Sequence, residues 1–242
     1  MSMRLRRLVA LPVATLSLLL PTATASAAAP GYALTETTTH VVIRWNPCAP
    51  IHYKVNVKHA PKGALADVKA AVARLHKATG MTLVYDGQTG AIPQTSFDHN
   101  LRPGHFPPMV IAWAKPGKGP GASNLLPATG AAGVGGIAWD QWFSRDGRYL
   151  YPLQVVTGFV VMNDKYNASY RPGFGAGQTR GEVLLHELGH AVGLQHVGDP
   201  QQMMYPSAIA RSKAEYGKGD LAGLKKVGKP AGCIKPKLYV WP

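Results

Sequence analysis

The sequence predicts an α+β domain, because strand-like and helix-like patterns follow one another along a chain of 242 residues. Residues 51–57 alternate apolar and polar side chains, as a half-buried strand does, and residues 109–114 form the continuous apolar run of a buried strand. Between them, apolar side chains recur every three or four residues over 63–79, which indicates an amphipathic helix. A second and more apolar helix is predicted to begin near Arg180.

The remaining elements complete this order. Gly80 is expected to end the first helix, and Asp146-Gly147 is a favoured hairpin turn. The other predicted segments are strands at 41–45, 81–85, 136–139 and 155–162, and a closing helix that starts near Asp220.

The first 28 residues have the pattern of a secretory signal peptide. Several arginines give a positive start, an apolar run covers 8–20, and small residues follow over 23–29. A membrane anchor is the alternative, but a spanning helix needs about 20 apolar residues. We therefore expect a secreted, extracellular protein without a stable membrane anchor. A flexible arm is expected over 29–40, before a single folded domain over 41–242.

Secretion changes the interpretation of the two cysteines, Cys48 and Cys233. In an oxidising compartment an even pair of cysteines predicts a disulfide, which here closes a long loop. Two free buried thiols are the alternative. A zinc site built on either cysteine is disfavoured, because neither has a second ligand at close spacing.

The chain is strongly basic, with a net charge of +14. Such a charge is compatible with contact to an anionic cell wall. Lysines and arginines are scattered, however, and no zinc finger or RNA-binding motif accompanies them, so no nucleic acid partner is expected. The glycine-rich stretch at 130–136 lacks the spacing of a phosphate-binding loop. We expect a monomer with a generally cationic surface.

The residues that could carry out a chemical reaction lie on the second predicted helix. Thr179 and Glu182 match a capping box, so the helix should start just after Thr179. His186 and His190 then project from one face about one turn apart and can direct ring nitrogens at one zinc ion. Glu187 would lie beside the metal, where it can take a proton from a water acidified by zinc.

A third ligand requires the chain to turn after this helix. Gly193 tolerates the left-handed conformation that ends helices, and the chain can then bring His196 to the same metal. Three protein ligands leave a fourth position open, which is the arrangement of catalytic zinc sites. The alternative, a pair of core histidines, would bury His186, Glu187 and His190 without partners, which is costly.

The string HELGHAVGLQH, followed by Met203-Met204-Tyr205-Pro206, resembles the metzincins, and within them the matrixin branch. The resemblance implies a single catalytic domain of the metzincin (zincin) fold. That fold has a twisted mixed sheet, a backing helix, an active-site helix and a C-terminal helix. The motif resemblance covers about residues 179–207, and the weaker match of architecture covers 41–232.

The resemblance also implies roles for single residues: His186, His190 and His196 match the zinc ligands, and Glu187 matches the general base. Met204 matches the methionine that forms a hydrophobic floor beneath the metal. Met203 is a rival for this role, but Pro206 favours Met204.

The chain departs from matrixins in two respects. Val197 stands where they usually have serine. The inhibitory cysteine that binds the zinc in matrixins is also missing, because the only N-terminal cysteine, Cys48, is expected to form the disulfide. His99 and His105 lie in the region of the matrixin structural zinc site but lack its His-x-Asp string, so we interpret them as loop histidines.

A calcium site is weakly supported. Asp140, Asp146, Asn163 and Asp164 offer oxygen ligands that suit Ca²⁺, although ordinary turn roles explain them as well.

The sequence therefore predicts a zinc-dependent endopeptidase that acts on proteins or peptides. The resemblance also implies that residues 136–141 and 155–164 flank the cleft, the first as an edge strand to which an extended substrate adds. The alternatives are a non-catalytic secreted module that binds zinc or cell-wall polymer, and a peptidase for cell-wall cross-links.

Overall fold

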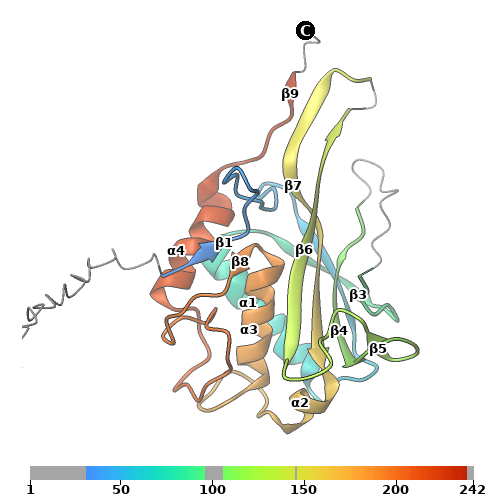
Figure 1. The fold of residues 1–242 in the computed structure, drawn as a ribbon, viewed down its shortest axis with the longest axis vertical. Coiled ribbons are helices and arrows are strands. Elements are labelled where there is room, and N and C mark those ends of the chain that lie inside the picture. Colours follow the sequence, from blue (N-terminus) through green and yellow to red (C-terminus); the bar gives the residue numbers. More distant parts are fainter. Residues whose placement is uncertain (1–30, 96–105, 145, 239–242) are drawn as a thin grey trace, which may run out of the picture.

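The computed structural model describes residues 31–95, 106–144 and 146–238. The predicted signal peptide over 1–28 and the two histidines His99 and His105 lie outside these residues. Figure 1 shows a strongly twisted sheet with the larger helices gathered along one side of it. Among the described helices, none has both the length and the apolar character that a membrane crossing requires.

The main sheet is mixed, and its principal strands follow the order β3-β2-β4-β7-β6. Strands β3, β2, β4 and β7 are parallel, whereas β6 is antiparallel to β7 and forms one edge. This arrangement agrees with the predicted fold class. The bounds are β2 Ile51–Asn56, β3 Leu83–Gln88, β4 Met109–Pro116, β5 Ala122–Ser123, β6 Gly133–Phe143, β7 Tyr149–Asn163 and β9 Lys237–Leu238.

The helices bury their apolar faces in a core shared with β2, β4 and β7. The predicted backing helix is confirmed as α1, Ala64–Thr79, and Gly80 ends it with a φ of 70°. The active-site and closing helices are α3, Arg180–Ala191, and α4, Lys218–Val227. A one-turn 3₁₀ helix, Lys229–Ala231, follows α4.

A buried ion pair joins the two central helices. The Arg180 guanidinium of α3 lies 2.8 Å from the Asp67 carboxylate of α1, and both side chains are almost fully buried. Removing one partner of such a pair leaves an uncompensated charge and costs about 3–5 kcal/mol. The pair therefore fixes the start of α3 against the backing helix.

The segment predicted as a flexible arm contributes a strand instead. Strand β1, Ala33–Leu34, pairs antiparallel with β8, Leu194–Gln195, directly beside the third histidine of the motif. The strand predicted over 41–45 is wrong: this segment holds only an isolated bridge between Val42 and Glu36. A strand of two residues is too short to show an alternating pattern in the sequence, so whether it forms depends on its partner strand.

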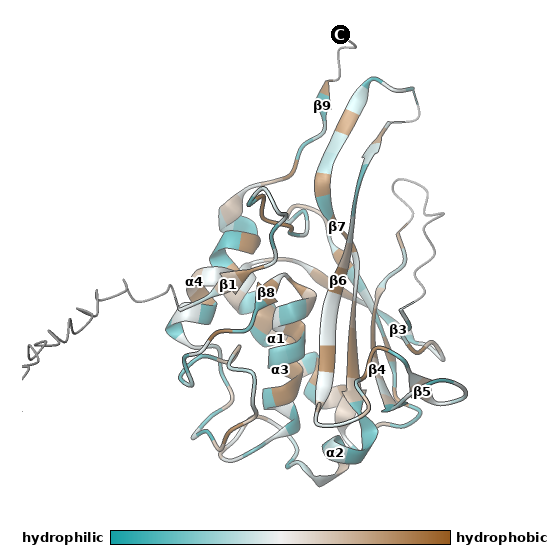
Figure 2. Cartoon of the chain, in the orientation of Figure 1, coloured by the Kyte–Doolittle hydropathy of each residue, from teal (hydrophilic) through white to brown (hydrophobic). Residues whose placement is uncertain are grey.

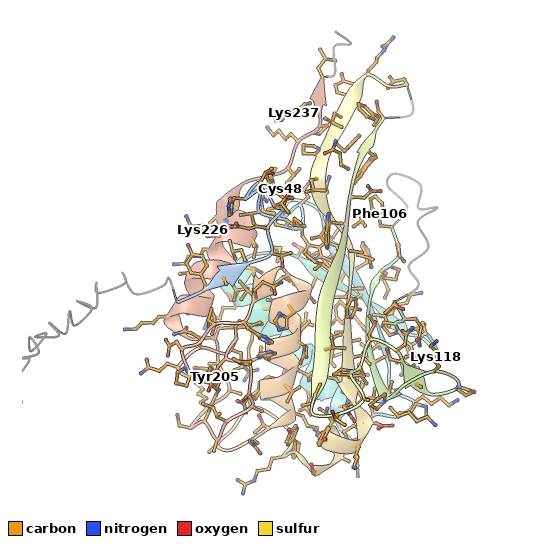
Figure 3. The ribbon with its side chains drawn as sticks, in the orientation of Figure 1. Cys48, Phe106, Lys118, Tyr205, Lys226 and Lys237 are labelled. Carbon is orange, nitrogen blue, oxygen red and sulfur yellow. A yellow bond between two sulfur atoms is a disulfide. The ribbon has the colours of Figure 1, made fainter. Side chains whose placement is uncertain are left out.

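The predicted disulfide is present between Cys48 and Cys233. It links the segment before β2 to the segment after α4, near the upper end of that helix (Figure 3). In the chain-entropy model, a loop of this size contributes about 3–5 kcal/mol by restricting the unfolded chain.

The hairpin of β6 and β7 is longer than the sequence predicted. The turn at Gly147 is confirmed, with a φ of 71° and an N–H that donates to the Ser144 carbonyl. The strands, however, run well past 136–139 and 155–162. Figure 2 shows apolar residues continuing along β7 into the part of the hairpin that projects beyond the helices.

Candidate metal centre

The helix that carries the motif begins as predicted. The Thr179 hydroxyl accepts a hydrogen bond from the Glu182 N–H at 3.1 Å and so caps α3. The second half of the predicted capping box is not formed. The Glu182 carboxylate instead pairs with Arg211 at 2.9 Å, within the core. A long-range ion pair has therefore replaced the local bond, which sequence spacing cannot reveal.

The three histidines of the motif meet at one point. The Nε2 atoms of His186 and His196 are 3.0 Å apart, those of His190 and His196 3.0 Å, and those of His186 and His190 3.2 Å. In the described part of the chain, this trio forms the one cluster of ligand side chains suited to a metal ion. The cluster comes from α3 and from the turn that follows it.

Backbone carbonyls set the tautomer of two of these rings. The His186 Nδ1–H donates to the Met203 carbonyl and the His190 Nδ1–H to the Leu194 carbonyl, each at 2.8 Å. A carbonyl can only accept, so Nδ1 carries the proton and Nε2 presents its lone pair. The rings are thus oriented by the partners that metal-bound histidines commonly have.

This donor set fits a zinc ion. Converging lone pairs repel one another unless a cation lies among them, and neutral imidazole nitrogens are preferred zinc ligands. Tetrahedral zinc with bonds of 2.0–2.1 Å would hold its nitrogens roughly 3.3 Å apart, close to the spacing found here. Burial lowers the pKa of His186 to about 3 and that of His190 to about 4, so both rings are neutral at physiological pH. Burial lowers the pKa of His196 as well.

Gly193 turns the chain toward the third histidine. Its φ is 103°, and its N–H donates to the His190 carbonyl at 3.0 Å. A side chain here would be strained and would press against the Ile43 carbonyl. Its own carbonyl accepts from the N–H of Thr35, the residue after strand β1, so the N-terminal segment also holds the turn that places His196.

Glu187 lies beside the cluster and is only 5% exposed. Burial raises its pKa to about 8, and a hydrogen bond from the Gly135 N–H opposes this rise. The glycines of β6 allow this contact. A Cβ at Gly133 would lie 2.9 Å from the Glu187 side chain, and one at Gly135 would overlap the Glu187 carbonyl. The glycine-rich stretch at 130–136, to which the sequence alone assigned no function, is therefore where β6 approaches the motif helix.

The two methionines after the motif have different positions. The Met204 sulfur lies so close to Gly189 of α3 that a Cβ there would collide with it. Met203 contributes its carbonyl to His186 instead. The Met204 side chain therefore packs against the motif helix, and its role as the floor beneath the histidines stays a prediction.

Asp220 holds this turn from the closing helix. Its carboxylate is fully buried and accepts from the backbone N–H groups of Met203, Met204 and Gly217. Burial raises the pKa of Asp220, and these three hydrogen bonds work against that rise. The sequence placed Asp220 only at the start of a helix, because nothing local indicated that its carboxylate reaches a turn about 16 residues earlier.

A cleft of about 890 Å³ runs between β6 and α3. The three histidines and Glu187 line its centre, residues 129–137 and Trp139 line one side, and residues 205–208 close another. Tyr205 is labelled in Figure 3, on the loop beside α3. The arrangement can hold a cation in an open groove beside a buried carboxylate.

The candidate calcium ligands have turn roles. The Asn163 side chain caps the short helix α2, Asp164–Ser169, which the sequence did not predict. Asp146 accepts from the Ser144 hydroxyl and the Arg148 N–H, and Asp140 accepts from the N–H of the next residue. These bonds account for Asp140, Asp146 and Asn163 without a metal, and calcium stays a prediction.

The fold and the histidine cluster together define a class. A mixed sheet, a backing helix and a motif helix followed by a glycine turn to a third histidine are the features of the metzincin fold. Residues 147–227 match the family model for matrixin, which covers β7, the motif helix, the methionine turn and α4. No curated protein matches the chain. The match supports a matrixin-like metzincin and, more generally, a metallopeptidase, a class of hydrolases.

Proposed function

We propose that this protein is a secreted zinc endopeptidase that cleaves proteins or peptides in the cleft between β6 and α3. One observation carries the proposal: three Nε2 lone pairs converge within about 3 Å of one another, beside the buried carboxylate of Glu187. His186, His190 and His196 would hold the zinc ion. When bound, that ion would supply a Lewis acid that polarises the peptide carbonyl and acidifies a water molecule.

Glu187 would be the general base. Its raised pKa reflects a carboxylate buried away from water, and a cation held by the neighbouring histidines would favour the ionised form. The ionised carboxylate accepts the proton of the attacking water and returns it to the leaving amine.

Strand β6 would bind the substrate backbone. Among the described strands, β6 pairs with β7 alone, so its other edge is open toward the cleft. An extended peptide can add to such an edge through backbone hydrogen bonds, which depend little on side-chain identity. The cleft is open rather than a closed pocket that would hold only the terminus of a substrate, which favours internal cleavage.

The boundaries of the mature protein are part of the proposal. Residues 1–28 would be removed during secretion, and residues 41–242 would form the catalytic domain. The disulfide between Cys48 and Cys233 supports an oxidising compartment. N-terminal sequencing of the protein recovered from culture medium would test the cleavage position.

A Glu187→Gln variant tests the mechanism. It should bind one zinc ion per chain, as the wild type does, and hydrolyse casein or a peptide library at least about 1,000-fold more slowly. Glu215→Gln, which changes an exposed glutamate paired with Lys213, is the matched control and should keep full activity. Full activity in Glu187→Gln, or protein that binds no zinc, would overturn the proposal.

A further inference from the structure

The hairpin extension, defined as residues 139–143 of β6 and 149–155 of β7 with the turn between them, carries aromatic side chains outside the main core. Trp139 is 48% exposed and Phe143 44% exposed. Large apolar side chains that gather on a surface indicate an interaction site. Neither residue has a role in the catalytic proposal.

The strand register assigns these side chains to faces. A Cβ at Gly133 or Gly135 would point at Glu187, whereas one at Gly136 would point at Phe159 on the other side. Side chains alternate along a strand, so odd-numbered residues of β6 face the cleft. Both register shifts place their extra residue on β7, which leaves the alternation along β6 intact. Trp139 and Phe143 therefore continue the cleft-facing side of β6, and Trp139 itself lines the cleft.

The opposite face braces the extension. Trp142 stacks on Tyr151 with ring centroids 5.1 Å apart and meets the edge of Phe106 at 4.9 Å. Figure 3 shows Phe106 beside the hairpin, on a separate segment of the chain. Three aromatic rings thus support the back of the extension, and the cleft-facing pair stays exposed in front of it.

We propose that Trp139 and Phe143 form a distal substrate-binding face that takes apolar side chains of a long, unfolded polypeptide. The inference rests on the proposed function. The face is continuous with the cleft through Trp139, and a peptide added to the edge of β6 would present every second side chain to it. From Gly135 to Phe143 the strand spans about 26 Å, so a substrate needs about eight residues on that side to reach the face.

Charge favours a polypeptide over an anionic polymer. Residues 139–155 contain two aspartates and two arginines, so the extension is neutral within a chain of net charge +14. A site for an anionic polymer would draw on the excess of lysine and arginine elsewhere. A neutral aromatic face instead suits apolar side chains from an unfolded segment.

A substrate-length series tests the face. We expect the wild type to cleave a peptide that extends about ten residues on each side of the scissile bond about tenfold more efficiently, in kcat/KM, than one extending three. The gain should vanish when the distal residues of the long peptide are changed to serine and glycine. It should also vanish in the double variant Trp139→Ala/Phe143→Ala. Retention of the gain in that variant, or no gain in the wild type, would overturn the inference.

Tyr149→Ala is the matched control. Tyr149 is 43% exposed on the same hairpin, but the register of Trp142 with Tyr151 places it on the braced face. It should leave the length dependence unchanged. If the wild type cleaves no peptide, the proposed function fails separately, and calorimetric binding of the long peptide to Glu187→Gln tests the face. Loss of that binding in the double variant supports the face. Unchanged peptide binding in the double variant contradicts the face, even if that variant loses self-association, glycan binding or vesicle binding.

Discussion

The histidine cluster and the hairpin extension border the same cleft but are held in different ways. Backbone acceptors fix the rings of His186 and His190, and a buried carboxylate fixes the turn beneath them. The extension is held by stacked aromatic rings at the protein surface. The difference indicates that the reacting groups are placed by directional bonds, which tolerate little change, whereas the distal face is placed by strand length and tolerates more.

Loss of one ligand should have the largest effect. His196→Ala leaves two histidines, too few for a catalytic zinc site, so we expect bound zinc to fall below one tenth per chain and activity to fall at least about 1,000-fold. Metal analysis and a peptide assay on the purified protein would show this. His52→Ala, on the exposed pair with Asp86, should change neither. If the His196→Ala variant retained its zinc, His196 would not be a zinc ligand.

The metal-free protein should lose stability in acid. The pKa values of His186 and His190 in the folded protein, about 3 and about 4, lie below the usual 6.5. The stability that depends on these two neutral rings is therefore fully present above pH 6.5 and is lost as the pH falls toward 4 and 3. At pH 5 this loss is roughly 2 kcal/mol per histidine. Glu187, with a pKa near 8, titrates in the opposite sense, because its folded form retains a proton that the unfolded chain releases above about pH 4.5.

Urea unfolding of metal-free Glu187→Gln between pH 7 and pH 5 isolates the histidines from this opposing change. A flat unfolding free energy over that range would contradict the prediction. Restoring zinc should steepen the dependence, because protons then compete with the metal for the rings.

A methyl group at Gly135 should force strand β6 away from helix α3. Gly135→Ala would place its Cβ against the Glu187 backbone, and we expect a loss of about 2–3 kcal/mol with reduced activity. Gly175→Ala is the control, because its Cβ would meet nothing within 4 Å and its backbone has no positive φ. Equal stability of the two variants, measured by denaturant unfolding, would show that the close approach of β6 is unimportant.

Asp220→Asn should loosen the turn beneath the histidines. Asparagine has one acceptor oxygen, so at least one of the N–H groups of Met203, Met204 and Gly217 loses its partner, at about 1–3 kcal/mol. Zinc affinity should fall as well, because Met203 also orients His186. Tyr216→Phe removes a neighbouring hydrogen bond to Leu185 and should lower stability without altering zinc affinity. Unchanged zinc affinity in Asp220→Asn would separate the turn from the metal site. The smallest effect expected is the tenfold change in long-peptide cleavage at the hairpin extension.

Much of the fold followed from local patterns. The backing helix, the start of α3 at Thr179 and the stop at Gly80 each depend on residues within a few positions of one another. The ligand spacing of His186, His190 and His196 is likewise local, because one helix and one turn carry it. The strand expected over 41–45 did not form, and β1 was not anticipated, because pairing between distant segments decides such short strands.

The sequence by itself determined which residues could meet a metal, since helix periodicity and a glycine turn place the three histidines together. It also determined the disulfide, because the chain holds a single pair of cysteines. Only the tertiary structure decided what surrounds that site. Gly135 contacts Glu187, and Asp220 binds the methionine turn, although these residues lie far apart in the chain. The strand register places Phe143 on the same side of β6 as Gly135. Such contacts depend on packing and register, which no local window of sequence contains.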